Sequence, residues 1–537
     1  MNIREIYQKY IAPHNAEIIF CLILLVMSCV VIMFKKNYHN DEIFSYGSAN
    51  YISDDGVGRL NVKPAPYTYT PAGDVFYEYL TVQEEDPFQI AHVWENQASD
   101  VHPPLYYLCL YVISFCFKGV FTKWIGGGIN IICILLALIA VRKLSAILGH
   151  SEWETRLISI FFVLSPGILM QVAFMRMYVM AMCEVTWLTY LIIKNKQQES
   201  DKYYVLIGML CVAGGLTHYY FLIYLFFISA FYCLYLVFNR KIASLFKYII
   251  TMACAGGAVC AIFPAILSHI FGGESRGKES FDNLHGDIAQ LWDKIKFFYN
   301  KINSLLFGGI IFLLCVWALC VIIYMVRKEG IIELIGKCRN LNSNLIYGLA
   351  VICYFLLTAK ISVGHNERYV YPVFGVMIVG VLHGVVVVMG RYISQNKKEL
   401  QKITILLMTV MLFLSIKNCG WDYCFYNSDQ LVETIGMQYG HLNALCVVDS
   451  VKHQNKIRER FLEICKLKSI TFFEKNVNEL ENMEHLRDND MFILYVTDDV
   501  NVEEIVREIK EYCPQIDLCE KLGEGSRYTD VYLLSGN

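Results

Sequence analysis

IIFCLILLVMSCVVIMF, residues Ile18–Phe34, is an uninterrupted apolar segment, and KKNYHNDEIFSY, residues Lys35–Tyr46, follows it directly. The apolar part approaches the roughly 20 residues that a membrane-spanning helix needs. Arg4 and Lys9 precede it and no small-residue cleavage site follows it, so we expect an uncleaved first transmembrane helix and no signal peptide. This helix brings two adjacent acids, Asp41 and Glu42, to the membrane surface where it ends.

The composition of the whole chain is that of a polytopic membrane protein. Of its 537 residues, 56% are hydrophobic and 18% are charged, and its mean hydropathy is +0.42. A soluble protein of this length would carry far more charge. The composition also excludes a disordered chain and a basic nucleic-acid-binding protein. Further apolar runs follow the first at Pro103–Val120, Ile125–Val141, Leu157–Phe174, Tyr178–Ile193, Tyr203–Leu216, Tyr219–Phe238, Tyr248–Phe271, Leu305–Met325, Leu345–Thr358, Tyr371–Met389 and Ile403–Ile416.

The positions of Lys and Arg predict the orientation of these runs. Successive basic clusters are separated by two apolar runs each, as expected if all the clusters lie in the cytoplasm. Twelve crossings from a cytoplasmic N-terminus would not keep this pattern, so we expect Pro103–Val120 to be re-entrant or interfacial and about 11 helices to cross. The membrane domain, residues 1–419, then has two large outer loops, residues 35–102 and 272–303.

The segment 420–537 has a different pattern and predicts a small extracytoplasmic α/β domain. Short apolar runs at Leu445–Val448, Met491–Val496 and Val531–Leu534 are typical of buried strands, while Arg458–Lys466 and Val502–Tyr512 have helical spacing. The segment carries no phosphate-binding loop and no dinucleotide fingerprint.

The cysteine pattern argues against a zinc ribbon and a thioredoxin-type redox site. Of the 20 cysteines, most lie in apolar runs, and no CxxC pair occurs. The run Gly126-Gly127-Gly128 follows no strand, and we interpret it as a close helix contact or a flexible helix start.

Two polar segments stand out, and each has a structural interpretation beside a chemical one. Asp41-Glu42 at a helix exit is either a hydrated loop start or a functional pair, because carboxylates near lipid are unfavourable unless they are solvated or used. Asp100-Val101-His102-Pro103-Pro104 places an acid and an imidazole before a rigid double proline. It is either a helix-start signal, with Asp100 near the N-cap, or part of a site.

Taken with three later segments, these two resemble the GT-C glycosyltransferases, and more narrowly the protein O-mannosyltransferase and aminoarabinose-transferase-like (family-39-like) group. The resemblance covers roughly Ile18–Met389 and leaves the C-terminal domain outside it. The five motifs, in order, are NDEIFSY (Asn40–Tyr46), DVHPPLYYL (Asp100–Leu108), SPGILMQVAFMRMYVMAM (Ser165–Met182), GLTHYYFLIYLF (Gly215–Phe226) and GHNERYVYPVFGVMIV (Gly364–Val379).

The resemblance implies an enzyme that moves a sugar from a polyprenyl phosphate to an acceptor on the outer face of the membrane. In these enzymes the acid of the first loop, here Asp41, is the catalytic carboxylate, and Glu42 matches the second acid. The histidine-proline segment, here His102 and Pro103, lines the same cavity. The lipid-phosphate sugar is the donor, and the bilayer is the second partner.

The leaving phosphate needs cations, and the motifs supply candidates at the outer ends of later helices. Arg176 and Arg368 are the best placed, with Lys360 behind them. Each has an alternative interpretation: Arg176 as the partner of Glu184, and Arg368 as the partner of Glu367 or a residue that reaches toward the interface. Three further substrate-binding candidates come from the same motifs, namely His102, His218 and Tyr369. The alternative interpretation of Tyr369 is a residue of the interfacial aromatic belt.

Two other function classes remain open beside the transferase, which we expect to be a hexosyl- or pentosyltransferase. A transporter or flippase of lipid-linked sugars would favour helices broken near the midplane. A polymerase or ligase would normally carry its key Arg and His in a later outer loop. The acid pair directly after the first helix favours the transferase. A divalent ion remains undecided, because Asp41, Glu42, Asp100 and His102 lack strong ligand spacing. The acceptor is undetermined among a protein, a wall polymer and a lipid.

Overall fold

The computed structural model describes residues 15–536 except for the segments 37, 53–59, 61–66, 273–275, most of 314–342, 393–395, 425–433, 450–455, 459, 476–489 and 523–528. The chain divides into two compact units. The helical unit contains residues 1–34, 101–106 and 126–421, and the mixed unit contains residues 35–100, 107–125 and 422–537.

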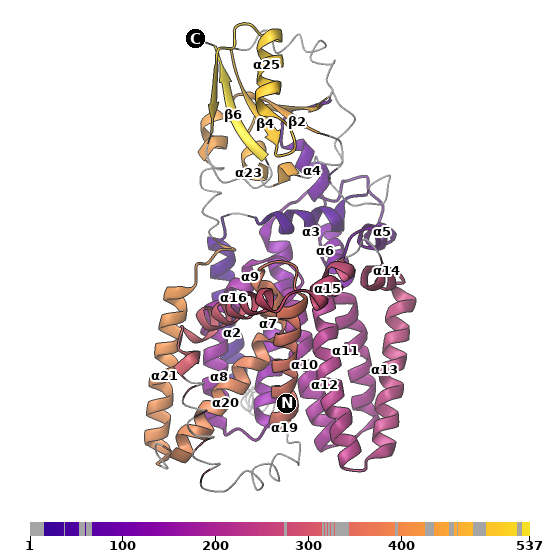
Figure 1. Ribbon diagram of the computed structural model, residues 1–537, viewed down its shortest axis with the longest axis vertical. Coiled ribbons are helices and arrows are strands. Elements are labelled where there is room, and N and C mark those ends of the chain that lie inside the picture. The colour runs from indigo at the N-terminus through magenta and orange to yellow at the C-terminus, as the bar shows by residue number, and fades with distance from the viewer. Residues whose placement is uncertain are drawn as a thin grey trace, which may run out of the picture. The chain divides into compact units, whose positions relative to one another are not determined.

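The helical unit is a bundle of long apolar helices, seen together in Figure 1. Within it, α10 packs on α11, which follows it in the sequence, while α11 also packs on α13 and α12 packs on α19. The elements of this unit are α2 (Asn15–Phe34), α7 (Lys123–Ile147), α8 (Glu152–Leu164), α9 (Pro166–Ala173), α10 (Tyr178–Gln197), α11 (Asp201–Thr217), α12 (Tyr219–Phe238), α13 (Ile242–Ile262), α14 (Ala265–Phe271), α15 (Arg276–His285), α16 (Ile288–Phe307), α19 (Ser343–Ile361), the 3-10 helix η3 (Glu367–Val373), α20 (Phe374–Tyr392) and α21 (Lys397–Asn418).

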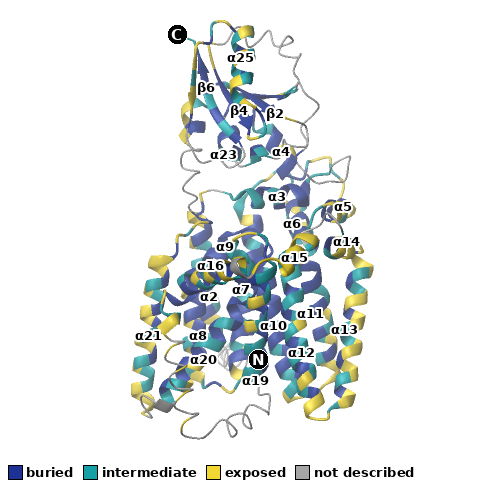
Figure 2. Cartoon of the chain, viewed as in Figure 1, coloured by how far each residue is buried: buried dark blue, intermediate teal, exposed yellow. Residues whose placement is uncertain are grey.

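Large apolar side chains lie on the outside of this unit, which identifies the surface that faces lipid. Figure 2 shows exposed residues along α13 and α21, and these include Phe246, Ile250, Leu406 and Phe413, each more than 60% exposed. Contiguous apolar surface of this kind is unfavourable in water and favourable in hydrocarbon. The predicted polytopic membrane fold is therefore confirmed.

Among the described residues, seven helices are long and apolar enough to cross a membrane, or eight if the bent pair α8–α9 is one span. The run predicted at Tyr178–Ile193 also forms a continuous helix, α10, and the run at Tyr203–Leu216 forms α11, which has 17 residues. The crossing predicted at Leu305–Met325 lies partly outside the described residues. The predicted total of about 11 crossings thus stays a prediction.

Prolines divide three of the predicted runs into two elements each. Leu157–Phe174 breaks at Ser165, where α8 and α9 meet at a bend of 46° and Pro166 opens α9. Tyr248–Phe271 breaks before Pro264. The run Tyr371–Met389 begins in the 3-10 helix η3, which contains Pro372, and continues in α20. Proline lacks the backbone N–H and clashes with the preceding turn, so a helix ends or restarts there.

The mixed unit is built on a six-stranded sheet in the order β1-β3-β2-β4-β6-β5. The central strand β2 is parallel to β3 and β4, and the other pairs are antiparallel. The three predicted strands and the helix predicted at Val502–Tyr512 are confirmed, whereas Arg458–Lys466 keeps only a short α-helix. The elements are β2 (Asn443–Val448), α23 (Phe461–Ile464), β3 (Ser469–Glu474), β4 (Met491–Thr497), α25 (Val502–Tyr512), β5 (Leu518–Lys521) and β6 (Thr529–Ser535).

The segment predicted to be the first outer loop, with the helix that follows it, contributes the remaining elements of the mixed unit. Its strand β1 (Tyr67–Tyr69) pairs with β3 at one edge of the sheet. Its helices are α3 (Asn40–Asn50), α4 (Asp74–Leu80) and α5 (Ala91–Ser99), and α6 (Leu105–Cys116) follows. With 12 residues, α6 is shorter than a spanning helix requires, in agreement with the interfacial or re-entrant segment predicted there.

Candidate active site

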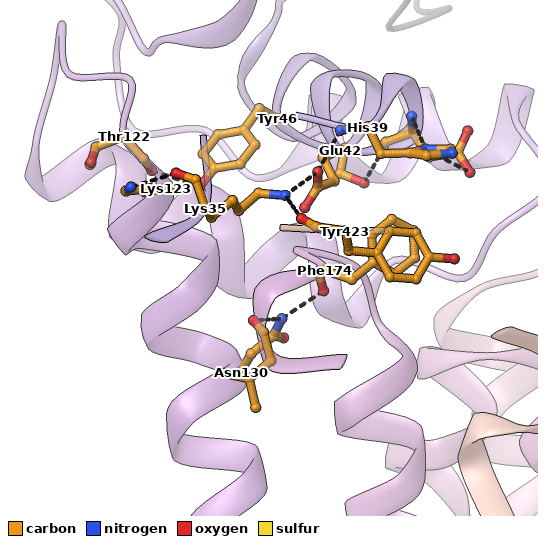
Figure 3. Close-up of polar contacts among 12 residues, drawn as sticks. Lys35, His39, Glu42, Tyr46, Thr122, Lys123, Asn130, Phe174 and Tyr423 are labelled. Carbon is orange, nitrogen blue, oxygen red and sulfur yellow. Dashed lines mark hydrogen bonds and ion pairs between the residues drawn. The ribbon is translucent and has the colours of Figure 1, made fainter. Parts of the chain in front are cut away.

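The two predicted acids lie in the first turn of α3, within the mixed unit, and their side chains have different surroundings. Glu42 is fully buried, and its Oε2 accepts hydrogen bonds from the His39 backbone N–H at 2.6 Å and from Lys35 Nζ at 2.9 Å. Lys35 Nζ also donates to the Tyr423 carbonyl at 2.7 Å. Figure 3 shows Lys35 between these two acceptors.

Glu42 therefore fixes the start of the helix. It occupies the third helical position of a capping box in which the His39 side chain also accepts a backbone N–H. The side chains of Lys35 and Glu42 are 1% and 0% exposed. Removing one member of a buried ion pair leaves an uncompensated charge, at a cost of about 3–5 kcal/mol.

Asp41, in contrast, has a side chain that is 33% exposed. Its backbone N–H donates to His39 Nδ1 at 3.1 Å, so this nitrogen is an acceptor and carries no proton. The 3.8 Å contact between His39 Nδ1 and Asp41 Oδ2 is consequently not an ion pair in this arrangement. Of the two acids, Asp41 is the one that a substrate from solution can reach.

A second group of predicted residues lies within the helical unit. Arg176, between α9 and α10, is 3% exposed, and its Nη2 lies 3.2 Å from His102 Nε2. Because a guanidinium only donates, His102 accepts through Nε2, and its own ring proton is on Nδ1. The sequence separates these two residues by 74 positions, and the fold brings them into contact.

His218 belongs to the same group. It is 5% exposed, and its ring centroid lies 6.4 Å from that of His102 and 5.1 Å from that of Tyr178. Its Nδ1 accepts the Tyr220 backbone N–H at 3.1 Å and caps α12. Burial holds the pKa of the His218 imidazole well below its ordinary value, and the nearby His102, Arg176 and Arg368 act in the same direction. His218 is therefore neutral, with its proton on Nε2, where it can be donated to an anion.

Arg368 and Tyr369, in η3, complete the group. The Arg368 guanidinium carbon lies 5.6 Å from the centroid of the Phe174 ring and 6.0 Å from that of Tyr178. This is the geometry of a cation–π contact. The Tyr369 ring stacks on Tyr220 with a centroid distance of 4.7 Å and an interplanar angle of 10°.

The neighbouring acids bear on the alternative interpretations of the two arginines. Within the part of the chain that the structure describes, Glu184 makes no ion pair with Arg176, and its polar contact is with Thr217 Oγ1 at 2.8 Å. Glu367 lies 3.9 Å from Lys301 Nζ.

The Thr217 hydroxyl contacts two oxygens, that of Glu184 and the Ala213 carbonyl, which lies 3.0 Å from Thr217 Oγ1. A hydroxyl has only one proton, so it cannot donate to both oxygens. Both contacts are satisfied together when Glu184 is protonated, since the acid then donates to Thr217 and Thr217 donates to Ala213.

Other predicted residues lie elsewhere. Lys360 Nζ donates to the Gly286 carbonyl at 2.6 Å. Asp100 is the C-cap of α5 and does not cap α6, so its interpretation as an N-cap was wrong. Among the described residues, no group of three or more His, Cys, Asp and Glu could hold a metal ion.

Several residues that support these sites were not predicted. Asn130 of α7 is fully buried and donates to the carbonyls of Val172 at 3.1 Å and Phe174 at 2.8 Å, as drawn in Figure 3. The Phe174 carbonyl also accepts the Arg176 N–H at 2.7 Å, so Asn130 fixes the segment that carries Arg176. A polar residue inside an apolar run was the available signal for Asn130. The roles of Lys35 and Tyr178 depend on distant segments and left no such signal.

The Gly126-Gly127-Gly128 run has the predicted packing role at one position. A Cβ on Gly127 would come within 2.7 Å of Ile32 Cδ1, whereas one on Gly128 would meet nothing within 4 Å. Gly127 therefore allows α7 to approach α2 closely.

Comparisons with known proteins give a fold. The family described as "Domain of unknown function (DUF6311)" matches residues 104–307. No curated protein matches the chain. Crystal structures of ArnT from Cupriavidus metallidurans, one bound to undecaprenyl phosphate and one in the apo state, align with 97% of this chain and 98% of their own, at 9% and 10% identity and a TM-score of 0.50 each.

The oligosaccharyltransferase of Archaeoglobus fulgidus in its apo form is also similar, at 12% identity and a TM-score of 0.47, covering 86% of this chain and 65% of its own. ArnT is an aminoarabinose transferase with the GT-C glycosyltransferase fold. The match to ArnT over nearly the whole chain confirms the GT-C fold that the five motifs imply.

Proposed function

We propose that this chain is an inverting glycosyltransferase that moves a sugar from a polyprenyl-phosphate donor to an acceptor on the outer face of the membrane. The observation that carries the proposal is the group formed by Arg176, His102, His218 and Arg368 in the helical unit. ArnT, which has the same fold, is known in a complex with undecaprenyl phosphate.

The group has the composition of an anion site. Two guanidinium groups supply positive charge and planar donor pairs that match phosphate oxygens. His218 adds a neutral N–H donor, and Tyr220 and Tyr369 supply a stacked aromatic surface beside it. Arg176 is 3% exposed and Arg368 is half-buried. The phosphate of a lipid donor would bring a negative charge to these two guanidinium groups.

In the proposed reaction, the oxygen of an acceptor hydroxyl forms a bond to the anomeric carbon of the sugar. The bond from that carbon to the phosphate oxygen breaks, and the polyprenyl phosphate leaves with the electron pair. The hydroxyl proton passes to a carboxylate, the role that the motif resemblance assigns to Asp41. Glu42 acts through the helix start that it caps.

Binding of undecaprenyl phosphate to the purified protein tests the donor site without knowledge of the acceptor. Arg368→Ala removes one charge-assisted contact and should weaken binding by about ten- to a hundredfold, or roughly 1.5–3 kcal/mol. Arg368→Lys should recover only part of this, because Lys provides a point charge in place of a planar fork.

Arg156→Ala is a matched control, because Arg156 is 57% exposed and pairs with Glu152 on α8. It should bind the lipid as the wild type does. Equal affinity of Arg368→Ala and the wild type would remove Arg368 from the donor site. If neither binds the lipid, a polyprenyl-phosphate donor is excluded.

The bent pair α8–α9 favours a second candidate, a transporter of lipid-linked sugars. Discontinuous helices whose ends face a binding site are common in transporters. The two functions are distinguished by reconstitution into vesicles with a lipid-linked sugar. A transporter moves the intact lipid to the other leaflet. A transferase that is also given an acceptor with a free hydroxyl moves the sugar to that hydroxyl and releases polyprenyl phosphate.

A further inference from the structure

The α/β sheet of the mixed unit is joined to the loop that carries Asp41. Strand β1, from the middle of that loop, pairs antiparallel with β3 through the register Tyr67–Phe472, Thr68–Thr471 and Tyr69–Ile470. The hydroxyls of Thr68 and Thr471 lie 2.9 Å apart. A strand of three residues is too short to be stable alone, so this part of the loop depends on the sheet for its structure.

Phe461, the first residue of α23, contacts three aromatic rings from the N-terminal part of this unit. Its ring lies 5.9 Å from Tyr38, 5.1 Å from Phe76 and 5.2 Å from Phe121, each time edge to face. Tyr38 directly precedes the N-cap of α3, Phe76 lies in α4, and Phe121 follows α6. Edge-to-face aromatic pairs contribute about 0.5–1.5 kcal/mol each beyond the area that they bury.

Arg458, just before α23, contacts α3 itself. Its guanidinium carbon lies 4.9 Å from the centroid of the Phe44 ring, and Phe44 is three residues beyond Asp41. Burial raises the pKa of the Tyr79 hydroxyl, and a hydrogen bond from Arg458 opposes this shift. Arg458 thus contacts both α3 and the α4 residue that packs on it.

Tyr423 and Cys424, at the start of the segment 422–537, complete the contact. Tyr423 offers its carbonyl to Lys35, the cation that neutralises Glu42, and the Cys424 carbonyl accepts the Lys36 N–H at 3.2 Å. Segments from the C-terminal part therefore contact α3 directly at Phe44, through Lys35 at its capping acid, and through Tyr38 just before its N-cap.

We propose that the C-terminal α/β domain is a positioning module for α3, and that Phe461 and Arg458 are positioning residues for Asp41. The inference rests on the proposed function, since it assigns the domain a part in presenting the catalytic carboxylate. It predicts that loosening these contacts slows turnover without weakening the binding of the lipid donor.

Phe461→Ala in the full-length protein tests the inference. The three ring contacts are lost, so α3 should become more mobile and kcat should fall about ten- to a hundredfold, the effect of a small misplacement of a reacting group. The KM for the donor should stay within about twofold, because the arginines are unchanged. Phe461→Tyr, which keeps the ring, should restore kcat.

Tyr532→Ala is the matched control. Tyr532 is a half-buried aromatic residue of β6 in the same domain, where its ring lies 5.9 Å from Lys521 Nζ and its hydroxyl donates to Asp530 at 3.4 Å. It should leave kcat and KM unchanged. If Phe461→Ala and Tyr532→Ala behave alike, or if KM rises in place of a fall in kcat, the positioning role is refuted.

Hydrogen exchange of the backbone amides of residues 40–50 separates this inference from the proposed function. Faster exchange in Phe461→Ala but not in Tyr532→Ala supports the contact to α3 even if the chain transfers no sugar. Unchanged exchange in both variants overturns the inference, whatever the activity of the protein is.

Discussion

Asp41 and Glu42 are adjacent in the sequence, but the fold gives them different environments. Glu42 is buried and accepts hydrogen bonds from Lys35 and His39, while the Asp41 side chain is one-third exposed. From the sequence, both were candidates for catalysis. Their separation depends on Lys35 and Tyr423, and Tyr423 is 388 positions away from Lys35, so spacing within the motif could not predict it.

Asp41→Asn should abolish sugar transfer while leaving folding near that of the wild type. Asn keeps the size of the side chain and removes the charge that accepts the proton, and loss of a catalytic base typically costs about 10²–10⁴-fold in rate. Turnover of the purified variant checks this. A variant with more than about a third of the wild-type turnover, a threshold far above the range for a lost base, would exclude Asp41 from the chemistry.

Glu42→Gln should act on stability. The Lys35 ammonium would lose its buried partner, and the free energy of unfolding of the mixed unit should fall by about 3–5 kcal/mol. Denaturant unfolding, monitored by hydrogen exchange of the backbone amides of residues 40–50, measures the effect. The double variant Glu42→Gln and Lys35→Met should recover part of the lost stability, because the uncompensated charge of Lys35 is removed. Full stability of the single variant would contradict the buried ion pair.

Glu184→Gln should be nearly neutral in stability and in donor binding. A protonated Glu184 and a Gln side chain can both donate to Thr217 Oγ1, so the hydrogen bonds to Thr217 and Ala213 persist. The thermal midpoint and the affinity for undecaprenyl phosphate are the measurements. A large loss of either would restore the alternative that Glu184 is a charged partner of Arg176.

Among the elements, most of the long helices could be predicted from hydropathy, and α12 has the predicted bounds. The positions of the breaks at Pro166 and Pro264 could have been inferred from the prolines, since a helix restarts there. Strand β1 could not, because three residues carry too little pattern and their partner strand lies about 400 positions away. The motifs proposed Arg176, His102, His218 and Arg368 as candidates, and the fold places these residues in one group, whereas Asn130 was missed.

Helix α3 packs against α4 through Gly47, and this contact can be tested alone. A Cβ on Gly47 would come 1.8 Å from Cζ of the buried Tyr79 ring, so Gly47→Ala forces the helices apart. We expect a loss of about 1–3 kcal/mol in stability, typical of an overpacked core. Gly348→Ala is the control, because a Cβ there meets nothing within 4 Å. Equal melting temperatures for the two variants would contradict the packing.

At the level of the entire chain, the sequence predicts a membrane domain followed by a separate C-terminal domain. The fold groups residues 35–100 and 107–125 with residues 422–537, so the predicted first outer loop belongs to the same compact unit as the C-terminal sheet. Hydropathy separates apolar from polar segments but does not indicate which polar segments pack together. The association depends on side chains such as Phe461, which has no distinguishing signal in the sequence.

The predicted topology places Asn366 and Gly536 on the same side of the membrane. Two predicted crossings, Tyr371–Met389 and Ile403–Ile416, separate them. Single cysteines introduced by Asn366→Cys and by Gly536→Cys, in a background without the other accessible cysteines, should both react with an impermeant reagent on intact cells. Reaction of the first alone would contradict the number of crossings, and reaction of neither would reverse the orientation.

The most direct test of the proposed transferase is mass spectrometry of lipid-linked sugars and of glycans in cells that lack this protein. We predict that one polyprenyl-phosphate sugar accumulates and one glycan loses a sugar. Wild-type protein should restore both, and Asp41→Asn protein, expressed at the same level, should restore neither. Unchanged lipid-linked sugars and glycans in the deletion, or full restoration by Asp41→Asn, would contradict the proposal that this chain transfers a sugar from a lipid phosphate by means of Asp41.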